Sequence, residues 1–550
     1  MSGAIQAVLV ALAGAAWLAL FTRAVLVAAR MYQIEEYEAR RLFHWGRSTA
    51  WLLHRSVLVA AVPAALATLF ALTDVGRPGL SLALPVAWLV GAMVSQALWQ
   101  WLPPKKELVL TPRMRRLLGT TMVLAAVVAG LVCVALQVAP SWLGGVAATV
   151  AAALLTAVTM VLLALANAIN APVEAQVRRG FLRRARRRLE AFHPLVIAVA
   201  GSYGKTSTKH ILAHMLERYG PTLATPKSFN TLMGVCRTVN DHLEERHRTF
   251  VVEMDAYASG EIASICALVH PRHALLTSVG PQHLERFGTI ERIGAALYET
   301  IESLPPQGFA VVYAGDGPTA ALAARARAAG HEVIRYGIEG DAGDPEVIAR
   351  NVRITGAGSR FTWRWSAAGL EHDVVVPLLG RHQVLNVSAA LATVHCLGMP
   401  LEPALDAVAS LRPVDHRLQL VATGNAITVI DDSYNANPVG VHNGLEVLAE
   451  LEVRSRILVT PGLVELGSVE DAENRHYGEH AARVCDHVIV MDARPGRALR
   501  EGLRAGGLAD DHVHVVRSLA QATEVIGRIA GAGDAVLFAN DLPDTYLGAA

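Results

Sequence analysis

Long apolar stretches without a charge occupy the first third of the chain. They run through Met1–Thr22, Ser56–Thr73, Pro78–Pro104 and Leu117–Val173, and the last of them holds 57 residues. Because a hydrocarbon core of about 30 Å needs about 20 helical residues, this last stretch is long enough for two spans joined by a turn near Ala139–Trp142. The pattern predicts a transmembrane bundle of five helices, near residues 4–28, 56–73, 81–102, 119–138 and 145–168.

Basic residues are unevenly distributed among the segments that join these helices. Residues 30–55 hold five arginines, 103–116 hold five Lys or Arg, and 178–188 hold seven arginines, whereas 139–144 hold none. Segments on the cytoplasmic side of a membrane carry an excess of Lys and Arg. We therefore expect a multi-pass protein of the inner cell membrane, with its N-terminus outside and the chain after residue 173 in the cytoplasm.

The arginine run at 178–188 has two interpretations, a nucleic-acid patch or a contact with lipid headgroups. Its position directly after a predicted span favours the lipid headgroups. No ionisable residue lies in the middle of a predicted span, which argues against a transporter. We therefore expect a lipid bilayer as partner and no nucleic acid.

Composition and charge change at the same boundary. The 550-residue chain is 53% hydrophobic and 18% charged with a net charge of +1. This total hides a net charge of +7 over residues 1–173 and of −6 over residues 174–550. Five scattered cysteines without a CxxC pair predict neither a zinc site nor a disulfide framework.

From Pro194 onward, short apolar runs alternate with segments of helical periodicity, which predicts α/β domains with parallel sheets. We expect a basic juxtamembrane linker over 174–193, a central domain over 194–412 and a C-terminal Rossmann-like domain over 413–550. Between 345 and 379 the alternation of apolar and polar residues predicts a small antiparallel insertion. The expected strands are Leu195–Ala200, Thr249–Met254, Ala274–Val279, Ala310–Tyr313, Thr428–Ile430, Arg456–Thr460, His487–Met491 and Ala535–Ala539. The expected helices include Thr208–Tyr219, Ile290–Ser303, Val384–Leu397, Val439–Glu450 and His476–Cys485.

The first of these strands runs into a glycine-bearing turn followed by Lys-Thr. The segment is Gly201, Ser202, Tyr203, Gly204, Lys205, Thr206 and Ser207. Such a strand–turn–helix junction directs backbone N–H groups at phosphate, with Lys205 reaching the β- and γ-phosphates and Thr206 reaching Mg²⁺. Val199 stands where the general pattern has its first glycine. An ordinary turn would not need the lysine, and Lys205 is one of only three lysines after residue 173.

Several polar residues elsewhere have both a functional and a structural interpretation. Glu253 ends a strand and His283 follows another, so both would lie at the edge of the sheet where α/β proteins bind ligands. Taken alone, His283 is more typical of a surface or capping histidine. Asp431 and Asp432 could contact a nucleotide or cap a turn, and Asn386 within a helix needs an amide partner, either adenine or backbone.

Taken in order, these segments resemble the Mur ligase family of ATP-dependent amide-forming enzymes, most closely its D-alanyl-D-alanine-adding branch. The resemblance covers roughly residues 194–550 and is carried by AGSYGKTST, TPKSFN followed by Gly234, VVEMDAYASGEI, SVGPQHLERFGTIERI, GRHQVLN, DHRLQ, DDSYNANP and GLVELG. It implies a central P-loop ATPase domain, ATP and Mg²⁺ as cofactors, and an acyl phosphate that an amine then attacks.

The resemblance also implies roles for individual residues. Lys205, Glu253 and His283 would be catalytic, and Thr206, Glu253 and His283 would bind the metal. Beside the loop residues 201–207, nucleotide contacts would come from Asn386, Arg417 and Asp432. The residues that would contact the substrates are Asn230, Tyr434, Asn435 and Asn437.

Three departures from the family pattern limit this transfer. Family members commonly carry a carbamate-modified lysine where this chain has Leu297, so a second metal site is in doubt. The predicted membrane region replaces the soluble domain that holds a UDP sugar, and Asn540–Asp544 replaces a Lys-Gly-Ser turn. We therefore expect a membrane-anchored ligase that joins an amino acid or dipeptide to a lipid-linked or polymeric acid. Its expected protein partners are proteins of envelope or polymer biosynthesis. A poly-γ-glutamate-type synthetase and an inactive ATP-binding scaffold are the alternatives.

Overall fold

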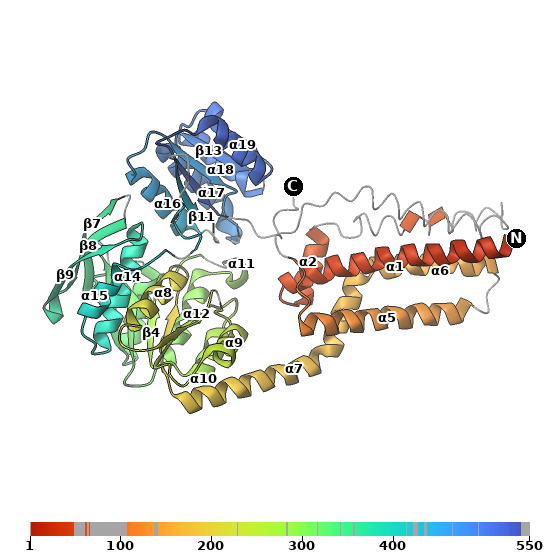
Figure 1. Ribbon diagram of the computed structural model, residues 1–550, viewed down its shortest axis with the longest axis horizontal. Helices are drawn as coiled ribbons and strands as arrows, with labels where there is room; N and C mark the ends of the chain where they lie inside the picture. Colours follow the sequence, from red (N-terminus) through yellow and green to blue (C-terminus); the bar gives the residue numbers. More distant parts are fainter. Residues whose placement is uncertain are drawn as a thin grey trace. The chain divides into compact units, whose positions relative to one another are not determined.

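The computed structural model describes residues 2–48, 61–62, 65–66, 107–136, 141–227, 229–281, 284–315, 317–341, 343–355, 358–413, 415–421, 427–433, 437–464, 466–492 and 494–540. These residues form two compact units, which divide between Arg178 and Arg179. The division falls inside one helix, α7 (Thr159–Phe192) (Figure 1). Each unit is described by itself below.

The first unit is a helical bundle. Its other helices are α1 (Ser2–Ile34), α2 (Ala39–Ser48), α5 (Pro112–Leu136) and α6 (Ser141–Ala157). A buried cluster that includes Phe21, Leu117 and Leu163 joins α1, α5 and α7. The Trp17 Nε1–H donates to the carbonyl of Ala152 at 3.0 Å and links α1 to α6.

Three described segments are long and apolar enough to cross a membrane: Ala11–Ile34, Pro112–Leu131 and Thr159–Phe192. The predicted spans 56–73 and 81–102 lie almost entirely outside the described residues. The predicted single helix at 145–168 is wrong, because α6 ends at Ala157 and α7 begins at Thr159. The Thr159 hydroxyl donates to the carbonyl of Thr156 at 2.8 Å, and such bonds to the preceding turn perturb a helix locally. The segment expected as a linker, 174–193, continues α7 to Phe192.

The central domain is built on a nine-stranded sheet in the order β2-β3-β1-β4-β5-β6-β7-β8-β9. Its strands are β1 (Leu195–Ala200), β2 (Thr222–Ala224), β3 (Thr249–Glu253), β4 (His273–Leu276), β5 (Phe309–Tyr313), β6 (Glu332–Ile338), β7 (Val347–Thr355), β8 (Gly358–Trp365) and β9 (Leu370–Val376). The first seven pair in parallel, and β8 and β9 are antiparallel. The chain order changes direction at β1, which lies between β3 and β4. Doubly wound sheets bind ligands beside such a strand.

Helices cover both faces of this sheet. The helices are α8 (Lys205–Leu216), α9 (Leu232–His242), α10 (Glu261–Val269), α11 (Leu284–Phe287), α12 (Ile290–Glu302), α13 (Gly317–Ala328), α14 (Arg381–Cys396) and α15 (Glu402–Val408), with a short 3₁₀ turn at Ser366–Ala368. One core cluster packs α8, α14 and α15 on one face. A second cluster packs α9, α10, α12, α13 and the end of α7 on the other, through Ala185 and Leu189.

The C-terminal domain has a six-stranded sheet in the order β10-β11-β15-β12-β13-β14, parallel except for β10. Its strands are β10 (Gln419–Val421), β11 (Thr428–Asp432), β12 (Arg456–Thr460), β13 (His487–Met491), β14 (Val513–Val516) and β15 (Ala535–Ala539). Its helices are α16 (Pro438–Glu450), α17 (Glu470–Val484), α18 (Arg494–Ala505) and α19 (Leu519–Ile529), with 3₁₀ turns at Gly467–Val469 and Asp510–His512.

The predicted α/β class and two-sheet organisation are confirmed. The predicted insertion is antiparallel, but it is not separate, because β7 pairs in parallel with β6 and continues the main sheet. Sequence reasoning missed β2, β6, β10 and β14. Of these, β6 has Arg335 in its middle, and this charged residue interrupts the apolar run that would have predicted a strand. The Arg335 guanidinium pairs with Glu346 at 3.2 Å.

Candidate functional site

The glycine-bearing turn of residues 201–207, called the phosphate loop below, lies at the carboxyl end of β1, where α8 begins. Gly201 and Gly204 have φ values of +140° and +80°, which favour glycine. The Thr277 hydroxyl, after β4, donates to the carbonyls of Tyr203 at 2.5 Å and of Ala200 at 3.2 Å. A Cβ atom on Gly201 would lie 1.9 Å from this hydroxyl oxygen. The loop is therefore held against β4 in one conformation.

Lys205 opens α8, and its side chain is only 6% exposed. Its ammonium donates to the carbonyls of Gly201 at 2.6 Å and of Ser202 at 3.2 Å, and lies 3.3 Å from a carboxylate oxygen of Asp255. The loop thus folds its carbonyls around the lysine that the sequence identifies as a phosphate ligand. Ser207 is buried in the first turn of the same helix.

Glu253 is the centre of a buried polar network at the end of β3. Its Oε1 accepts from the hydroxyl of Thr206 at 3.0 Å and from the side-chain amide of Asn230 at 3.2 Å. Its Oε2 accepts from the ammonium of Lys209 at 2.8 Å. The structure therefore brings three predicted residues, Thr206, Glu253 and Asn230, into one cluster beside Lys205.

Lys209 and Asp255 belong to this cluster, and sequence reasoning missed both. The Lys209 side chain is 0% exposed, and burial lowers the pKa of its ammonium against the attraction of Glu253. Asp255 lies two residues after Glu253, and its Oδ2 accepts from Asn230 at 3.4 Å. Two signals could have found Lys209: lysine is scarce in this part of the chain, and a residue four positions after Lys205 shares its face of α8.

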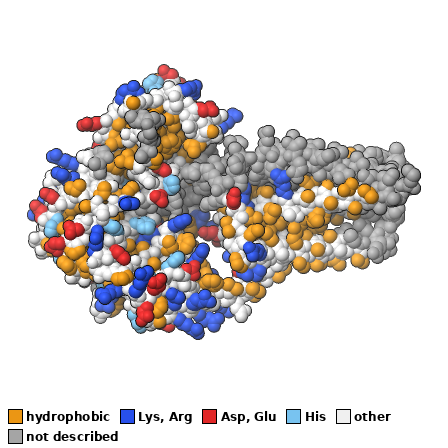
Figure 2. Space-filling model, in the orientation of Figure 1, with side chains coloured by type: hydrophobic (Ala, Val, Ile, Leu, Met, Phe, Trp, Pro, Cys, Tyr) orange, Lys and Arg blue, Asp and Glu red, His pale blue; other side chains and the backbone are white. Residues whose placement is uncertain are grey.

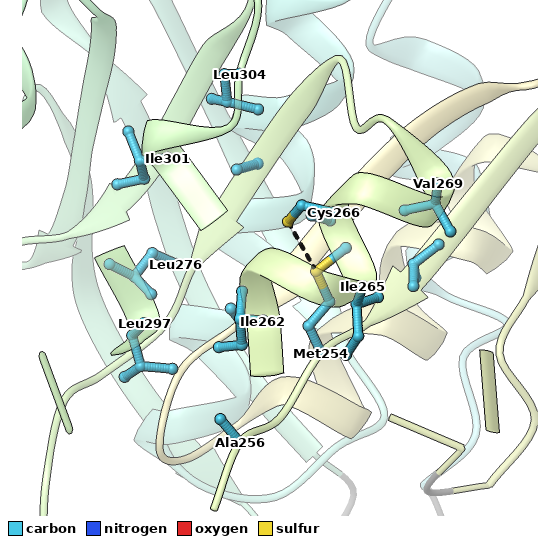
Figure 3. Packing of buried hydrophobic residues seen from close by; sticks show 14 of the residues in the cluster. Met254, Ala256, Ile262, Ile265, Cys266, Val269, Leu276, Leu297, Ile301 and Leu304 are labelled. Atoms are coloured by element: carbon cyan, nitrogen blue, oxygen red, sulfur yellow. Dashed lines mark hydrogen bonds between the residues drawn. The ribbon is translucent and has the colours of Figure 1, made fainter. Parts of the chain in front are cut away.

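An apolar wall faces this polar cluster. A small recess is lined by Gly201, Ser202, Asp255, Ala256, Phe287, Ile293, Ala296 and Leu297. Leu297 is 4% exposed and belongs to the core cluster on its face of the sheet. Figure 3 shows Leu297 and Ile301 of α12 beside Leu276 of β4 and Ile262 of α10. Leu297, where the sequence departs from the pattern of the family that it resembles, is therefore part of the hydrophobic core.

Asn386 lies on α14 and contacts the start of α8. Its Oδ1 accepts from the hydroxyl of Thr208 at 3.0 Å, and its Nδ2 donates to Gln383 at 3.1 Å. A Cβ atom on Gly204 would lie 2.8 Å from the same Oδ1. The amide that the sequence associates with adenine is thus placed against the phosphate loop.

The C-terminal domain places Arg417 and Asp432 close together at the end of β11. The N–H of Leu418 donates to Asp432 Oδ1 at 3.2 Å. Burial raises the pKa of Asp432 to about 7, although Arg417 and this hydrogen bond act in the opposite direction. His416 and Leu418, which flank Arg417, both have a left-handed backbone, with φ of 62° and 43°. Such strain is common where a side chain must be placed for function.

The pKa of the neighbouring carboxylate, Asp431, is shifted in the opposite direction. Burial tends to raise its pKa, but hydrogen bonds from Ser433 and His416 outweigh this effect and lower it. The Ser433 hydroxyl lies 2.6 Å from Asp431 Oδ1, and the His416 ring nitrogen lies 2.6 Å from Oδ2. The pKa of Asp431 is therefore lowered, whereas that of its neighbour Asp432 is raised to about 7.

The predicted substrate residues of this domain are only partly described. Asn437 is the N-cap of α16, and its Oδ1 accepts from the N–H of Gly440 at 2.8 Å. Tyr434 and Asn435 lie outside the described residues, as does the predicted catalytic and metal-binding residue His283.

Comparison with known proteins assigns both domains. Residues 199–394 match the Mur ligase middle domain, and residues 416–540 match the Mur ligase glutamate ligase domain. The chain is 30% identical over 357 residues to the UDP-N-acetylmuramate–L-alanine ligase of Mycobacterium ulcerans, and the match covers 62% of this chain and 70% of that protein. The chain belongs to the Mur ligase family.

Other relatives of this Mur ligase are similar over the same region. The UDP-N-acetylmuramoyl-tripeptide–D-alanyl-D-alanine ligase of Escherichia coli is 32% identical over 297 residues, which is 54% of this chain and 64% of that protein. The crystal structure of MurF from Acinetobacter baumannii matches with a TM-score of 0.59 and 26% identity, over 66% of this chain and 77% of that one. The chain thus spans just under two thirds of the length of the Escherichia coli relative.

ATP and Mg²⁺ are the cofactors of this family. The described residues fit both. Loop N–H groups, the start of α8 and Lys205 suit phosphate, while the Thr206 hydroxyl and the Glu253 carboxylate are oxygen donors of the kind that Mg²⁺ prefers beside nucleotide phosphates. Within the described residues, no group of three or more His, Cys, Asp and Glu side chains could hold a metal ion on its own.

Proposed function

We propose that this Mur ligase is an ATP-dependent acid–amine ligase, anchored in the cell membrane, that adds an amino acid or dipeptide to an acid of the cell envelope. The observation that carries the proposal is the convergence of Lys205, Thr206, Glu253 and Asn230 at the carboxyl edge of the central sheet. Mur ligase domains on both sides of the junction near residue 414 support it.

In the first step, formation of the acyl phosphate, different side chains would bind the phosphate, the Mg²⁺ and the acid. Lys205 and the loop N–H groups would hold the γ-phosphate, and Thr206 and Glu253 would hold Mg²⁺, which withdraws charge from the phosphates when bound. An oxygen of the acid's carboxylate bonds to the γ-phosphorus while the bond to ADP breaks. Asn230 would orient the acid, and its position supports this role, because its side-chain amide donates to Glu253 and Asp255 in the same cluster.

In the second step the amine nitrogen attacks the carbonyl carbon of the acyl phosphate, inorganic phosphate leaves, and the amine loses a proton. Arg417 and Asp432 on the C-terminal domain would contact the nucleotide, and closure about the segment near residues 411–416 would bring the amine to the acyl phosphate. Tyr434, Asn435 and Asn437 are proposed for the amine side, and His283 for the metal.

The helical unit supports attachment to a membrane. Large apolar side chains point outward along its helices, among them Val123, Val127 and Leu131 on α5, which are 52–66% exposed. Figure 2 shows hydrophobic side chains gathered over α1 and α5. Exposed apolar surface of this kind is normally covered by lipid or protein. On α7, six of the seven arginines of residues 178–188 are exposed, which suits anionic headgroups.

The acid is proposed to be lipid-linked or polymeric, because the family matches begin at residue 199 and the helical unit precedes them. Purified full-length protein should release ADP and phosphate only when both an acid and an amine are present. Probes include UDP-N-acetylmuramoyl-tripeptide with D-alanyl-D-alanine, and glutamate oligomers with glutamate. Product size separates a single addition from polymer synthesis.

Lys205→Ala is the control for this assay and should abolish ADP release. The proposal is overturned if Lys205→Ala turns over as well as the wild type, or if nucleotide binds without turnover on every acid and amine tested. Membrane attachment is tested separately by carbonate extraction of cell membranes, which should leave the protein in the pellet.

A further inference from the structure

The buried pair Lys209–Glu253 is costly for the protein to keep. Both side chains are shielded, with 0% and 1% exposure. Removing two charges from water is expensive, and replacing such a pair by apolar residues is often neutral or stabilising. Stability alone therefore gives little reason for a lysine at the bottom of this site.

The geometry gives the two oxygens of Glu253 different environments. Oε2 is taken by the Lys209 ammonium at 2.8 Å, whereas Oε1 meets the Thr206 hydroxyl at 3.0 Å and the Asn230 amide at 3.2 Å. Lys209 thus fixes the rotation of the carboxylate so that one oxygen faces the residue that follows Lys205 in the loop.

Lys209 has a second partner on another segment. Its ammonium donates to the carbonyl of Lys227 at 2.6 Å, three residues before Asn230. Lys227 has a φ of 46°, a left-handed conformation that is uncommon for lysine. One ammonium therefore joins α8, the end of β3 and the segment that carries Asn230.

We propose that Lys209 is a positioning residue for the proposed cation site, which holds Glu253 with Oε1 turned toward Thr206 and Asn230 and which also binds the carbonyl of Lys227. This inference rests on the proposed function, since it requires nucleotide and Mg²⁺ to bind at this loop. The ammonium of Lys209 donates to Glu253 and to the carbonyl of Lys227. It acts through Glu253.

The test compares nucleotide binding with and without Mg²⁺ in the full-length protein, using a fluorescent ATP analogue. Lys209→Met keeps the length of the side chain and removes its charge. We expect it to reduce the Mg²⁺-dependent gain in affinity about 10-fold or more, which is typical for residues that orient a metal ligand. Affinity without Mg²⁺ should stay within about 2-fold of the wild type, because Lys205 and the loop are unchanged. The Mg²⁺ concentration for half-maximal ADP release should rise in parallel.

A double-mutant cycle shows whether Lys209 acts through Glu253. In the Glu253→Gln background, Lys209→Met should add little further loss of the Mg²⁺ effect. Asp534→Asn is the matched control. It alters a carboxylate that is 0% exposed and paired with Arg454 at 2.8 Å in the C-terminal domain, so it should lower the melting temperature without changing the Mg²⁺ effect.

The proposal is overturned if folded Lys209→Met gains as much nucleotide affinity from Mg²⁺ as the wild type. If this variant does not fold, Lys209→Gln, which keeps one N–H donor, is held to the same criterion. A wild-type protein that fails to bind the nucleotide overturns the proposed function and this inference together. A wild-type protein with normal Mg²⁺-nucleotide binding confines a negative result to the role of Lys209.

Discussion

The two sheets of this Mur ligase hold a buried carboxylate at their carboxyl ends in different ways. Glu253, on the central sheet, is 1% exposed and accepts from Thr206, Asn230 and the ammonium of Lys209. Asp432, on the C-terminal sheet, is 8% exposed and accepts from the backbone N–H of Leu418. Glu253 has a buried cation against it, whereas burial raises the pKa of Asp432 to about 7 despite Arg417.

The two carboxylates therefore differ in whether a neighbouring side chain of the protein balances their charge. At the central sheet, charge is balanced within the fold, so the proposed cation site would be organised before ligands arrive. At the C-terminal sheet, burial instead raises the pKa of Asp432 to about 7. Two substitutions test this difference. One adds a charge beside the central site, and the other removes the ionisable group at the C-terminal site.

The largest effect is expected from a charge added to the apolar wall of the central site. Leu297→Lys would bury an ammonium among Phe287, Ile293 and Ala296, where the recess offers no carboxylate except Asp255, which already pairs with Lys205. An uncompensated buried charge costs about 3–5 kcal/mol. Thermal denaturation of the full chain should show a correspondingly lower melting temperature.

Leu297→Met is the matched variant, because it keeps volume and polarity and should cost less than about 1.5 kcal/mol. If Leu297→Lys were as stable as the wild type, the apolar wall would accept a buried charge. The expected difference between the apolar wall and the polar cluster of the recess would then be wrong.

The next effect is a pH dependence of stability from Asp432. Its pKa is about 7 in the folded protein, above its value of about 3.9 in an unfolded chain. The folded state therefore binds more protons between these values, so this stabilisation is full below about pH 4 and is lost as the pH rises to about 7. The loss is a few kcal/mol, at about 1.4 kcal/mol per pH unit.

Asp432→Asn isolates this contribution, because the amide cannot ionise. Unfolding midpoints measured at pH 4 and pH 8 should show the variant close to the wild type at pH 4 and more stable at pH 8. An unchanged difference between variant and wild type at the two pH values would show that Asp432 is not protonated in the folded state.

A smaller effect is expected from the loop backbone. Gly204→Ala introduces a side chain at a φ of +80° and places Cβ 2.8 Å from Asn386 Oδ1. The left-handed conformation costs about 1–2 kcal/mol, and displacement of Asn386 should also weaken nucleotide binding. Gly260→Ala is a close control, since its φ is +87° and nothing lies within 4 Å of the added Cβ. Equal nucleotide affinities in the two variants would contradict a role for the Gly204–Asn386 contact.

Much of the fold could be predicted from sequence where the signal is local. Strands β1, β12, β13 and β15 have the predicted bounds, because each is a continuous apolar run that becomes buried on both faces. Strands β2 and β14 were missed because they are short and partly exposed, so no such run marks them.

The candidate site divides in the same way. The glycines and Lys205 could be predicted because strand, turn and helix are contiguous in sequence. The scarcity of lysine and the spacing from Lys205 mark Lys209 itself, but its pairing with Glu253, 44 residues away, has no local signal. Leu297 was recognised as a departure from the family, but only the packing of α12 against β4 and α10 shows that core side chains surround it.

The smallest effect separates two roles of Asn437. Its side chain caps α16 through Gly440, so Asn437→Ala should cost about 1 kcal/mol, while Asn437→Ser should restore the cap. If Asn437 also contacts the amine, the serine variant should recover the melting temperature but keep a raised KM for the amine. Full recovery of both would make Asn437 a cap alone, and the sequence-based assignment of this residue to the substrate would be wrong. Recovery of stability without recovery of KM would extend the comparison, because the C-terminal sheet would then present Asn437 to a ligand as well as Asp432.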